Sequence, residues 1–448
     1  MAKLFGTDGV RGRSNTDPIT ADMVLKLAQA AAVKMHNPGY RNKVVIGKDT
    51  RLSSDMLEAA LTAGFTSMGM DVILIGILPT PAVAVVTSSM RADIGVMITA
   101  SHNLYEDNGI KFFGPDGYKI SDEAQSEIEY LVDQDLDRYL AFSPDIGRIT
   151  RDENEAGRYI EHMKFNMLKG IKIENMKVVL DCAHGAAYKI APTVLRELWA
   201  DVVVINSDPN GMNINKDCGA TSLGHLQDMV HKTRADIGLA LDGDGDRLIV
   251  CDERGKTIDG DQIIALIGGY MKKNDLLKNY EIVATIMSNM GLERYFNSIG
   301  LKLHRTQVGD RNVLEYMRQN NCNLGGEQSG HIILGDYGTT GDGIAAALQV
   351  LRIVSSQMQK PVSEICKVFK PVPQVSKAVK FKNNISLESE EFKNALKEAE
   401  NKLGEGGRII VRKSGTEPVI RIMAESDNEK MVKVVVEELC EFVKSQDK

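Results

Sequence analysis

The chain has 448 residues, of which 43% are hydrophobic and 26% are charged. This is the composition of an ordinary globular protein, and the length predicts about three domains. The net charge of −7 excludes a global field that attracts polyanions. Aromatic residues make up only 5%, with a single Trp, which argues against a stacking platform for single-stranded nucleic acid. We therefore expect no nucleic-acid partner.

We expect neither a membrane span nor a secretory segment. No apolar run is long enough to cross a bilayer, and the N-terminus lacks the apolar stretch of a signal peptide. The six cysteines are scattered and form no C-x-x-C pair, which is typical of free thiols in a reducing compartment. The protein is therefore expected to be cytoplasmic, with no membrane partner.

The first domain, residues 1–150, is predicted to alternate strands and helices. Strands are expected at 44–46, 72–75 and 94–98. One helix is expected to be capped by Ser53 or Ser54 and to end near Met68, and Pro79 opens the next. This order is typical of a mostly parallel sheet covered by helices.

Residues 151–252 repeat the plan and form the second predicted domain. Strands are expected at 177–181, 202–205 and 237–241, with a helix to about Leu198 and another from Ser222. The first of these helices must end at Trp199, without an easy left-handed residue. The pentapeptide R-A-D-I-G occurs at 91–95 and again at 234–238, each time before an apolar strand, which favours a duplicated unit.

Two further domains are predicted, at 253–368 and 369–448. The third again alternates, with helices at 261–271, 291–298, 310–319 and 341–354 and strands at 282–286 and 301–306. Prolines mark a linker, and the tail reads as strand, helix (390–403), strand (408–411), strand (419–423) and helix. The predicted fold class is α/β, with a smaller C-terminal α+β domain.

Asp242, Asp244 and Asp246 stand at alternate positions in D-G-D-G-D-R, between two apolar strands. Carboxylates about 6 Å apart repel by roughly 3 kcal/mol per pair at an effective dielectric near 20. The repulsion predicts a cation, and oxygen ligands without nearby Cys or His indicate Mg²⁺ or Ca²⁺. A calcium EF-hand would need Gly where Arg247 stands, and helices as flanks. Arg247 suits a metal that shares its shell with a phosphate, whereas the alternative is a polar turn with solvated acids.

Three other loops could take part in chemistry. Thr99-Ala-Ser-His-Asn103 follows the third strand; Ser101 could carry a phosphoryl group or simply cap a helix, and His102 could be structural. Lys111 lies beside this loop in the sequence and alone would be an ordinary surface residue. Gly325–His331 offers hydrogen-bonding groups suited to sugar hydroxyls, or is a glycine-rich connection.

The last loop, 412–418, links two strands and is a phosphate nest or a hairpin turn. Arg421 follows three residues later, and near the N-terminus Arg11 lies between glycines in F-G-T-D-G-V-R-G. No G-x-x-x-x-G-K-[ST] loop occurs, so ATP hydrolysis through that motif is not expected.

Together these motifs resemble the α-D-phosphohexomutase family over the full length. F-G-T-D-G-V-R-G, T-A-S-H-N with N-G-I-K-F-F, D-G-D-G-D-R, G-G-E-Q-S-G-H and R-K-S-G-T-E-P occur in the family's order. The resemblance implies three similar α/β domains and a smaller fourth around one cleft. The opening motif favours the branch that acts on glucosamine phosphates, so it implies interconversion of glucosamine 6-phosphate and glucosamine 1-phosphate, feeding UDP-N-acetylglucosamine synthesis.

The resemblance also implies residue roles. Ser101 would be the phosphoserine, primed by a hexose 1,6-bisphosphate, and would hold one Mg²⁺ per subunit together with Asp242, Asp244 and Asp246. The remaining roles would be steadying the phosphoryl group (Arg247), binding sugar hydroxyls (Glu327, Ser329), gripping the other phosphate (Arg412, Ser414, Gly415, Thr416, Arg421) and charge stabilisation or proton transfer (Arg11, His102, Lys111, His331).

Two departures and two alternatives stay open. Leu104 stands where the family's loop usually has Pro, which loosens the loop, and Trp199 stands where relatives tend to have Gly. The chain could instead act on mannose or glucose phosphates, or bind a sugar phosphate or Ca²⁺ without catalysis. A homodimer is expected by resemblance.

Overall fold

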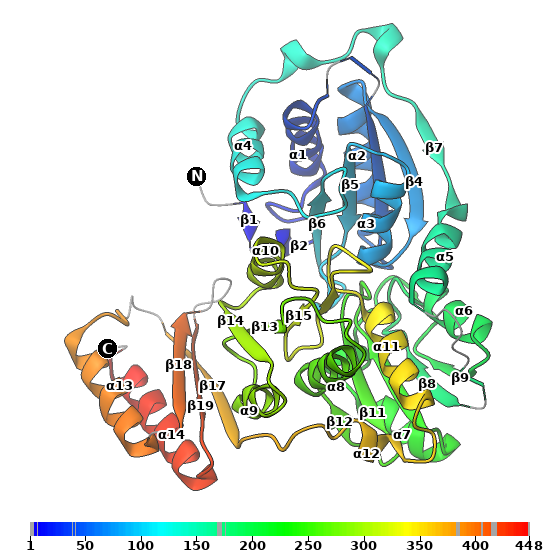
Figure 1. The fold of residues 1–448 in the computed structure, drawn as a ribbon. Coiled ribbons are helices and arrows are strands. Elements are labelled where there is room, and N and C mark those ends of the chain that lie inside the picture. The colour runs from blue at the N-terminus through cyan, green and yellow to red at the C-terminus, as the bar shows by residue number, and fades with distance from the viewer. Residues whose placement is uncertain are drawn as a thin grey trace. The chain divides into compact units, whose positions relative to one another are not determined.

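The computed structural model describes residues 4–6, 8–37, 39–40, 42–167, 173–174, 176–381, 386–404, 406–413 and 419–446 (Figure 1). It divides into two compact units, one made of 1–285 with 304–368 and the other of 286–303 with 369–448. Among the described residues, no helix is both long and apolar enough to span a bilayer.

The N-terminal part is a seven-stranded sheet of order β1-β2-β6-β5-β3-β4-β7. Its strands are β1 (Phe5–Gly6), β2 (Gly9–Arg13), β3 (Lys43–Lys48), β4 (Asp71–Ile77), β5 (Ile94–Ile98), β6 (Asp107–Phe113) and β7 (Ile149–Arg151). Its helices are α1 (Ala21–Lys34), α2 (Ser54–Ser67), α3 (Thr80–Ser89) and α4 (Asp122–Val132), with short turns η1 (Asp137–Tyr139) and η2 (Ser143–Asp145). β3, β4, β5 and β7 run parallel, and β1, β2 and β6 are antiparallel additions.

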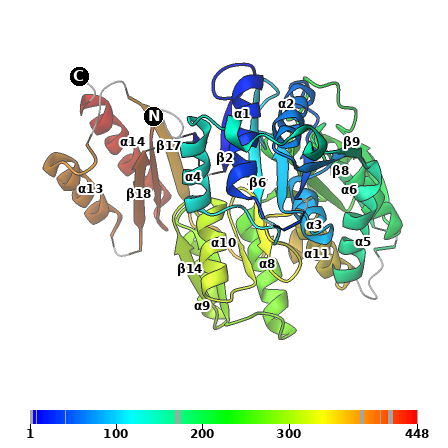
Figure 2. The ribbon, with the colours of Figure 1, turned by 90° about the horizontal axis from the view of Figure 1, so that it is seen from above.

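Helices cover both faces of this sheet, as a parallel sheet requires. α1, α2 and α4 share one hydrophobic core with alternate residues of the strands, such as Val44 and Ile46. On the opposite face Gly47 and Gly95 leave room for α3, because a Cβ at these positions would lie 2.5 Å from Val83 and 2.2 Å from Thr87. Figure 2 shows α1 and α2 together on one side of the sheet and α3 on the other.

The next sheet has five strands in the order β12-β11-β10-β8-β9. The strands are β8 (Lys177–Asp181), β9 (Asp201–Ile205), β10 (Ile237–Leu241), β11 (Leu248–Asp252) and β12 (Thr257–Ile258). The helices and turns are α5 (Ala156–Met167), α6 (Ile190–Glu197), α7 (Gly224–Thr233), η3 (Glu153–Glu155) and η4 (Gly219–Thr221).

A four-stranded sheet of order β14-β13-β15-β16 follows. It contains β13 (Glu281–Thr285), β14 (Lys302–Thr306), β15 (Leu324–Gly326) and β16 (Ile332–Leu334). The helices of this part are α8 (Gly260–Lys273), α9 (Met290–Ser298), α10 (Asp310–Gln319), α11 (Gly343–Ser355) and α12 (Val362–Ile365).

The C-terminal part is a three-stranded antiparallel sheet of order β17-β19-β18. β17 (Gln374–Lys380), β18 (Arg408–Lys413) and β19 (Val419–Glu425) pack with α13 (Glu390–Leu403) and α14 (Glu429–Gln446) around a core of its own (Figure 1, orange and red). The predicted class is confirmed: three α/β parts and a smaller C-terminal α+β part. The boundaries at 150, 252 and 368 stay predictions.

The three α/β sheets share one strand order. Each sheet contains a set of four strands, which begins in the chain with β3, β8 or β13. Numbered along the chain within its set, the four strands lie side by side in the order second-first-third-fourth: β4-β3-β5-β6, β9-β8-β10-β11 and β14-β13-β15-β16. The loops with Ser101, with the three aspartates and with Glu327 all connect the third strand of their set to the fourth. One repeated position in the fold therefore supplies three of the loops that the sequence singled out.

The repeated pentapeptide takes the same local structure twice. Asp93 accepts the Lys43 amide at 2.8 Å, and Asp236 accepts the Lys177 amide at 2.7 Å, so the two aspartates tie β3 to β5 and β8 to β10. The residue that opens each copy is left-handed, with φ 51° at Arg91 and 53° at Arg234. Equal sequence thus makes equal contacts at equal places.

The predicted elements lie within a few residues of the observed ones, with one correction at a cap. Ser53 occupies the N-cap of α2, but its side chain makes no cap hydrogen bond. Its hydroxyl lies 2.9 Å from that of Ser14, and the Ser54 hydroxyl donates to Asp49. Both hydroxyls are therefore used in tertiary contacts, which the local pattern did not indicate.

The sequence predicted that helix α6 ends at Trp199 without an easy left-handed residue; Trp199 follows the C-cap of this helix and is left-handed all the same, with φ 70° and 69% of its surface exposed. Such a conformation costs a non-glycine residue about 1–2 kcal/mol. We expect Trp199→Gly to raise the free energy of unfolding by about 0.5–1 kcal/mol, because little packing is lost and glycine's greater unfolded-state entropy offsets part of the gain. Trp199→Ala is the control and should gain nothing from the backbone. Denaturant unfolding followed by circular dichroism measures both, and a loss of stability in the glycine variant would contradict the expectation.

Candidate active site

The three aspartates lie in the turn from β10 to β11, completely enclosed. Asp242, Asp244 and Asp246 are 0%, 0% and 3% exposed. One oxygen from each lies within 4.8 Å of the others. Glycine is needed between them, because a Cβ on Gly243 would lie 2.7 Å from the carbonyl oxygen of Ser101. The sequence pattern therefore folds into a compact oxygen cluster.

Ser101 lies directly against this cluster. Its hydroxyl donates to Asp242 Oδ2 at 2.9 Å, although 141 positions separate the two residues. Ser101 is 1% exposed and has φ 52°, a left-handed conformation that few non-glycine residues adopt. A conformation of this kind persists only where the surroundings hold it.

Arg51 holds the backbone of the Ser101 loop. Its guanidinium donates to the carbonyl oxygens of Ser101, Asn103, Leu104 and Asp107, and Nε donates to Asp49 at 2.9 Å. From the second α/β part, the Asn215 amide donates to Ser101 and Asn103. These bonds fix the backbone of the loop at Ser101, Asn103 and Leu104.

We expect Arg51→Lys to destabilise the folded chain by about 2–3 kcal/mol and to lower turnover. An ammonium cannot reach four carbonyls and Asp49 at once, and buried acceptors without partners are costly. Arg151→Lys, at an exposed position on the edge strand β7, is the matched control and should stay within about 0.5 kcal/mol. Denaturant unfolding checks the change; equal stability of the two variants would show that Arg51 does not hold the loop.

Three cationic side chains approach the carboxylates. Lys111 on β6 is 2% exposed, and its Nζ lies 2.9 Å from Asp244 and 3.3 Å from Asp246. Arg247 places Nε 4.0 Å from both Asp242 and Asp246. Arg11 on β2 pairs with Asp8.

These charges set the protonation of the cluster. Burial raises the pKa of Asp242 well above its ordinary value, and Asp246 and Asp244 raise it further. Burial also acts to raise the pKa of Asp246, but Lys111 and His331 outweigh it and hold that pKa well below the ordinary value. Burial lowers the pKa of Lys111, but Asp244, Asp8 and Asp246 raise it well above normal, so the ammonium stays charged.

The two histidines differ. Burial lowers the pKa of His331, but Asp246 and Asp310 outweigh it and raise it to about 9. Its Nδ1 lies 3.6 Å from Asp246, and its Nε2 lies 3.4 Å from Asp310 and 3.1 Å from the Gly341 amide. Burial and then Arg247 lower the pKa of His102 to about 4, and its buried Nδ1 has no hydrogen-bond partner among the described residues. His331 therefore favours the charged form and His102 the neutral one.

The donor set fits a hard dication. Three of the four predicted ligands are carboxylates, and the fourth, Ser101, has its hydroxyl beside them. Asp244 Oδ1 and Asp246 Oδ1 are buried and accept no hydrogen bond from the described chain. Buried carboxylate oxygens that lack donors are expected where a cation binds.

Glu327 and Ser329, the residues predicted to bind sugar hydroxyls, lie in the tight hairpin between β15 and β16. Glu327 is half-buried, accepts the Gly309 amide at 3.1 Å and contributes to the field at Arg247. Ser329 is exposed at the tip of the same hairpin. Through the backbone bridge between Arg247 and His331, this hairpin adjoins the aspartate loop.

The predicted phosphate clamp lies in the second unit. Arg412 on β18 and Arg421 on β19 are directly opposite in the strand register. Like charges at opposite positions destabilise a sheet, and an anion between them would offset this. Ser414, Gly415 and Thr416 lie outside the described residues.

Five site residues were missed by the sequence reasoning: Asp8, Arg51, Lys119, Asn215 and Asp310. Asp8 and Asp310 contact Lys119, whose amine lies between them. Asp8 belongs to the opening motif, which was an available signal. The other four stand in segments with no unusual local pattern, so only their long-range contacts distinguish them.

Comparison with known proteins agrees with this geometry. Models of phosphoglucomutase/phosphomannomutase match the chain in four pieces: alpha/beta/alpha domain I at 2–138, domain II at 157–255, domain III at 259–372 and the C-terminal domain at 367–442. The chain belongs to the α-D-phosphohexomutase family. The predicted family and enzyme class, an intramolecular phosphotransferase, are therefore confirmed.

Within the α-D-phosphohexomutases, the chain is similar to proteins named phosphoglucosamine mutase. That of Parvibaculum lavamentivorans is 55% identical over 441 residues, covering 98% of each chain. That of Methylobacterium sp. (strain 4-46) is 55% identical over 444 residues, covering 99% of each.

Solved structures share the fold. A phosphoglucomutase/phosphomannomutase family protein from Burkholderia thailandensis has TM-score 0.82 at 22% identity, with 99% of this chain and 97% of that chain covered. The N-acetylphosphoglucosamine mutase of Aspergillus fumigatus, solved with GlcNAc-6P and magnesium, has TM-score 0.67 at 18% identity, with 99% and 96% covered.

Proposed function

We propose that this chain interconverts glucosamine 6-phosphate and glucosamine 1-phosphate through a phosphoserine at Ser101 and a bisphosphorylated sugar. The observation that carries the proposal is the 2.9 Å contact of the Ser101 hydroxyl with Asp242, inside a cluster of buried carboxylates. Relatives named phosphoglucosamine mutase, 53–55% identical over nearly the whole chain, support the sugar.

Mg²⁺ is the proposed cofactor, one per subunit, held by Asp242, Asp244, Asp246 and an oxygen of phosphorylated Ser101. When bound, the ion neutralises charge on the phosphoryl group in the transition state. The oxygens of Asp244 and Asp246 that accept no hydrogen bond support this assignment. We propose that a hexose 1,6-bisphosphate first phosphorylates Ser101.

The side chains around Ser101 are proposed to position charge. Phosphoryl transfer needs positioning and electrostatic stabilisation more than covalent help. Lys111 keeps its ammonium against Asp244 and Asp246, so it acts as a fixed charge. Arg247 reaches toward Asp242 and Asp246. Its buried Nε has no hydrogen-bond partner among the described residues, so this N–H group is available to donate to a phosphate oxygen. Arg11 adds a third positive charge.

His331 is proposed to hold and release the proton that the reacting hydroxyl exchanges. Charged, it donates toward Asp246 and Asp310; neutral, its Nε2 accepts the Gly341 amide. A group with two supported protonation states suits general acid–base work. His102, neutral at physiological pH, is the alternative.

Sugar and distal phosphate would be held elsewhere. Glu327 and Ser329 are proposed to bind sugar hydroxyls, and Arg412 with Arg421 to grip the phosphate that is not reacting, together with Ser414, Gly415 and Thr416. The cross-strand position of the two arginines supports the clamp. The bisphosphate must turn over between the two transfers, so the grip has to release and rebind.

A coupled assay on three substrates tests the proposal. Glucosamine 6-phosphate, mannose 6-phosphate and glucose 6-phosphate are compared at equal enzyme, with Mg²⁺ and the matching 1,6-bisphosphate. We expect the highest kcat/KM for the amino sugar, and phosphosite mapping by mass spectrometry should place one phosphoryl group on Ser101. Preference for mannose or glucose phosphate would support a phosphomannomutase or phosphoglucomutase instead, and binding without turnover would support a non-catalytic protein.

We also propose a cytoplasmic homodimer. Six buried cysteines, all free, suit a reducing compartment. Sedimentation velocity over a concentration series tests the dimer.

A further inference from the structure

Six side chains beside Ser101 form a closed ring of contacts. Lys111 contacts Asp8 at 3.0 Å and Asp246 at 3.3 Å, and His331 contacts Asp246 at 3.6 Å and Asp310 at 3.4 Å. Lys119 contacts both Asp8 and Asp310, which closes the ring. Three carboxylates thus alternate with two ammonium groups and an imidazole.

The ring joins all three α/β sheets. Asp8, Lys111 and Lys119 come from the first, Asp246 from the second, and Asp310 and His331 from the third. Its side chains are at most 18% exposed. Ion pairs shielded from water in this way are screened little by salt and are sensitive to the loss of one member.

Lys119 differs from the other cations of the ring. Its amine contacts Asp8 and Asp310, and neither belongs to the aspartate triad. Without its amine, two carboxylates would face each other and repel. Asp8 would then pull on Lys111, and Asp310 on His331, and both of these touch Asp246.

We propose that Lys119 is a positioning residue that holds Lys111 and His331 in register with the aspartate cluster across the three sheets. The inference rests on the proposed function, because its readout is turnover. The effect should fall on kcat, since Lys119 acts through the residues around the transferring group and not through those proposed to bind the sugar.

Other bonds keep the same sheets together when Lys119 is altered. Arg311 on α10 pairs with Asp122 and donates to the Ile120 carbonyl, and the Thr339 hydroxyl donates to the Gly117 carbonyl at 2.6 Å. A variant of Lys119 is therefore expected to fold.

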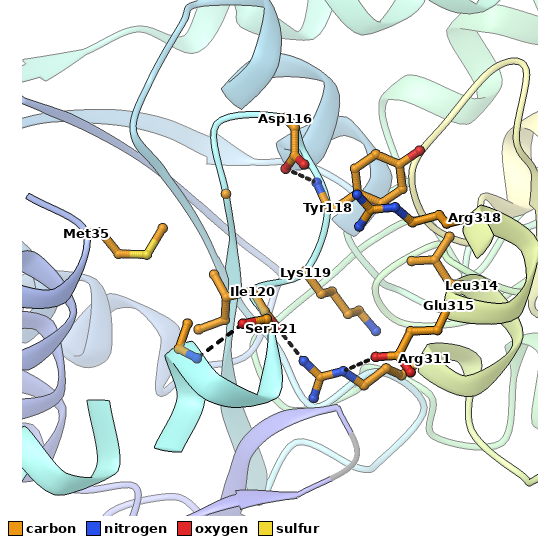
Figure 3. Close-up of a pocket in the computed structure, with 12 residues that line it drawn as sticks. Met35, Asp116, Tyr118, Lys119, Ile120, Ser121, Arg311, Leu314, Glu315 and Arg318 are labelled. Atoms are coloured by element: carbon orange, nitrogen blue, oxygen red, sulfur yellow. Dashed lines mark hydrogen bonds and ion pairs between the residues drawn. The ribbon is translucent and has the colours of Figure 1, made fainter. Parts of the chain in front are cut away.

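Lys119 is one of the residues that line a cavity of about 290 Å³. Figure 3 shows Lys119 between Ile120 and Arg311, and Arg318 over the ring of Tyr118. The cavity is large enough for a small alkylammonium ion, so a missing amine can be supplied from solution.

The first test compares Lys119→Ala with Arg318→Ala. Arg318 crosses the same boundary, from α10 to the loop at Tyr118, but lies outside the ring. We expect Lys119→Ala to lower kcat about 10–100-fold with KM changed less than about threefold, because small misplacements of reacting groups cost this much. Arg318→Ala should keep kcat within about twofold. Equal kcat in Lys119→Ala and the parent overturns the proposal.

The second test adds ethylammonium chloride to both variants, with potassium chloride at equal ionic strength as reference. We expect kcat of Lys119→Ala to rise several-fold and to saturate, while the parent and Arg318→Ala do not respond. Loss of kcat without rescue, at unchanged thermal stability, also overturns the assignment, because the ring then lacks something other than the charge.

A double variant separates charge from shape. Lys119→Met alone leaves two facing carboxylates, whereas Lys119→Met with Asp310→Asn leaves one. We expect the double variant to be more active than Lys119→Met. Lower activity in the double variant than in Lys119→Met would contradict the proposal that the amine of Lys119 acts by separating the two carboxylates. If the parent itself shows no mutase turnover, the proposed function fails, which is a separate result from turnover that ignores Lys119.

Discussion

Replacing Ser101 with alanine is expected to lower kcat by at least about 10⁴-fold. The hydroxyl is the proposed carrier of the phosphoryl group, and loss of a covalent nucleophile removes the whole two-step route. The fold should survive, since alanine bears the same left-handed strain at φ 52° and one hydrogen bond to Asp242 is lost. The coupled assay gives kcat, and thermal unfolding gives stability.

Ser88→Ala is the control for this change, because Ser88 is exposed on α3. It should keep full turnover and full phosphorylation at Ser101. The phosphoryl group should vanish from the intact mass of the Ser101 variant. Turnover within tenfold of the parent, or a phosphoryl group mapped to another residue, would contradict the role of Ser101.

Asp242→Asn is expected to lower turnover by at least about 10³-fold and to abolish the rise in melting temperature that Mg²⁺ gives the parent. A ligand that binds only the folded chain stabilises it by mass action, so the loss of one ligand removes that gain. The substitution keeps the side chain's size and removes its charge. Turnover in EDTA should fall in the parent by a similar factor.

In the absence of Mg²⁺, Asp242→Asn should instead be more stable than the parent. Burial, Asp246 and Asp244 raise the pKa of Asp242 in the folded chain above its ordinary value of 3.8. Ionising this group therefore costs folding free energy. The cost is absent below about pH 4, where the carboxyl is protonated in both states, and it grows as the pH rises through the folded pKa.

Without Mg²⁺, the parent should therefore lose stability relative to Asp242→Asn between about pH 4 and pH 8. Thermal unfolding of both proteins in EDTA across this range measures the difference. A parent that is more stable than the variant at pH 8 without metal would show that the carboxylates do not repel. Asp71→Asn, at the first residue of β4 and outside the aspartate cluster, is a control with the same change of charge.

The predictable part of the fold came from local periodicity. Short apolar runs at 72–75, 94–98 and 237–241 predict strands because neighbouring side chains in a strand point to opposite faces, and runs buried on both faces are apolar throughout. The repeated R-A-D-I-G indicated equivalent positions, and its two aspartates, Asp93 and Asp236, accept equivalent backbone amides. Ser53 was misjudged as a cap because its hydroxyl bonds to Ser14, far along the chain.

Part of the candidate site could likewise be predicted from the sequence, and part could not. Three aspartates at alternate positions indicated a cation from the sequence, because their repulsion is a short-range property of five residues. Lys119, Arg51 and Asn215 gave no local signal. Each contacts groups at least 50 positions away in the chain, so its partners are known only once the sheets are packed.

The sequence by itself determined the family, part of the strand and helix order and the oxygen-rich loop, since each depends on patterns of residues close together in the chain. The family resemblance implied that Ser101 meets Asp242, and the tertiary structure gives the contact. Only the tertiary structure decided that Arg51 holds the serine loop and that Lys119 closes a ring over three sheets. Contacts between separately formed sheets depend on how their faces pack, and no periodicity along the chain records that packing.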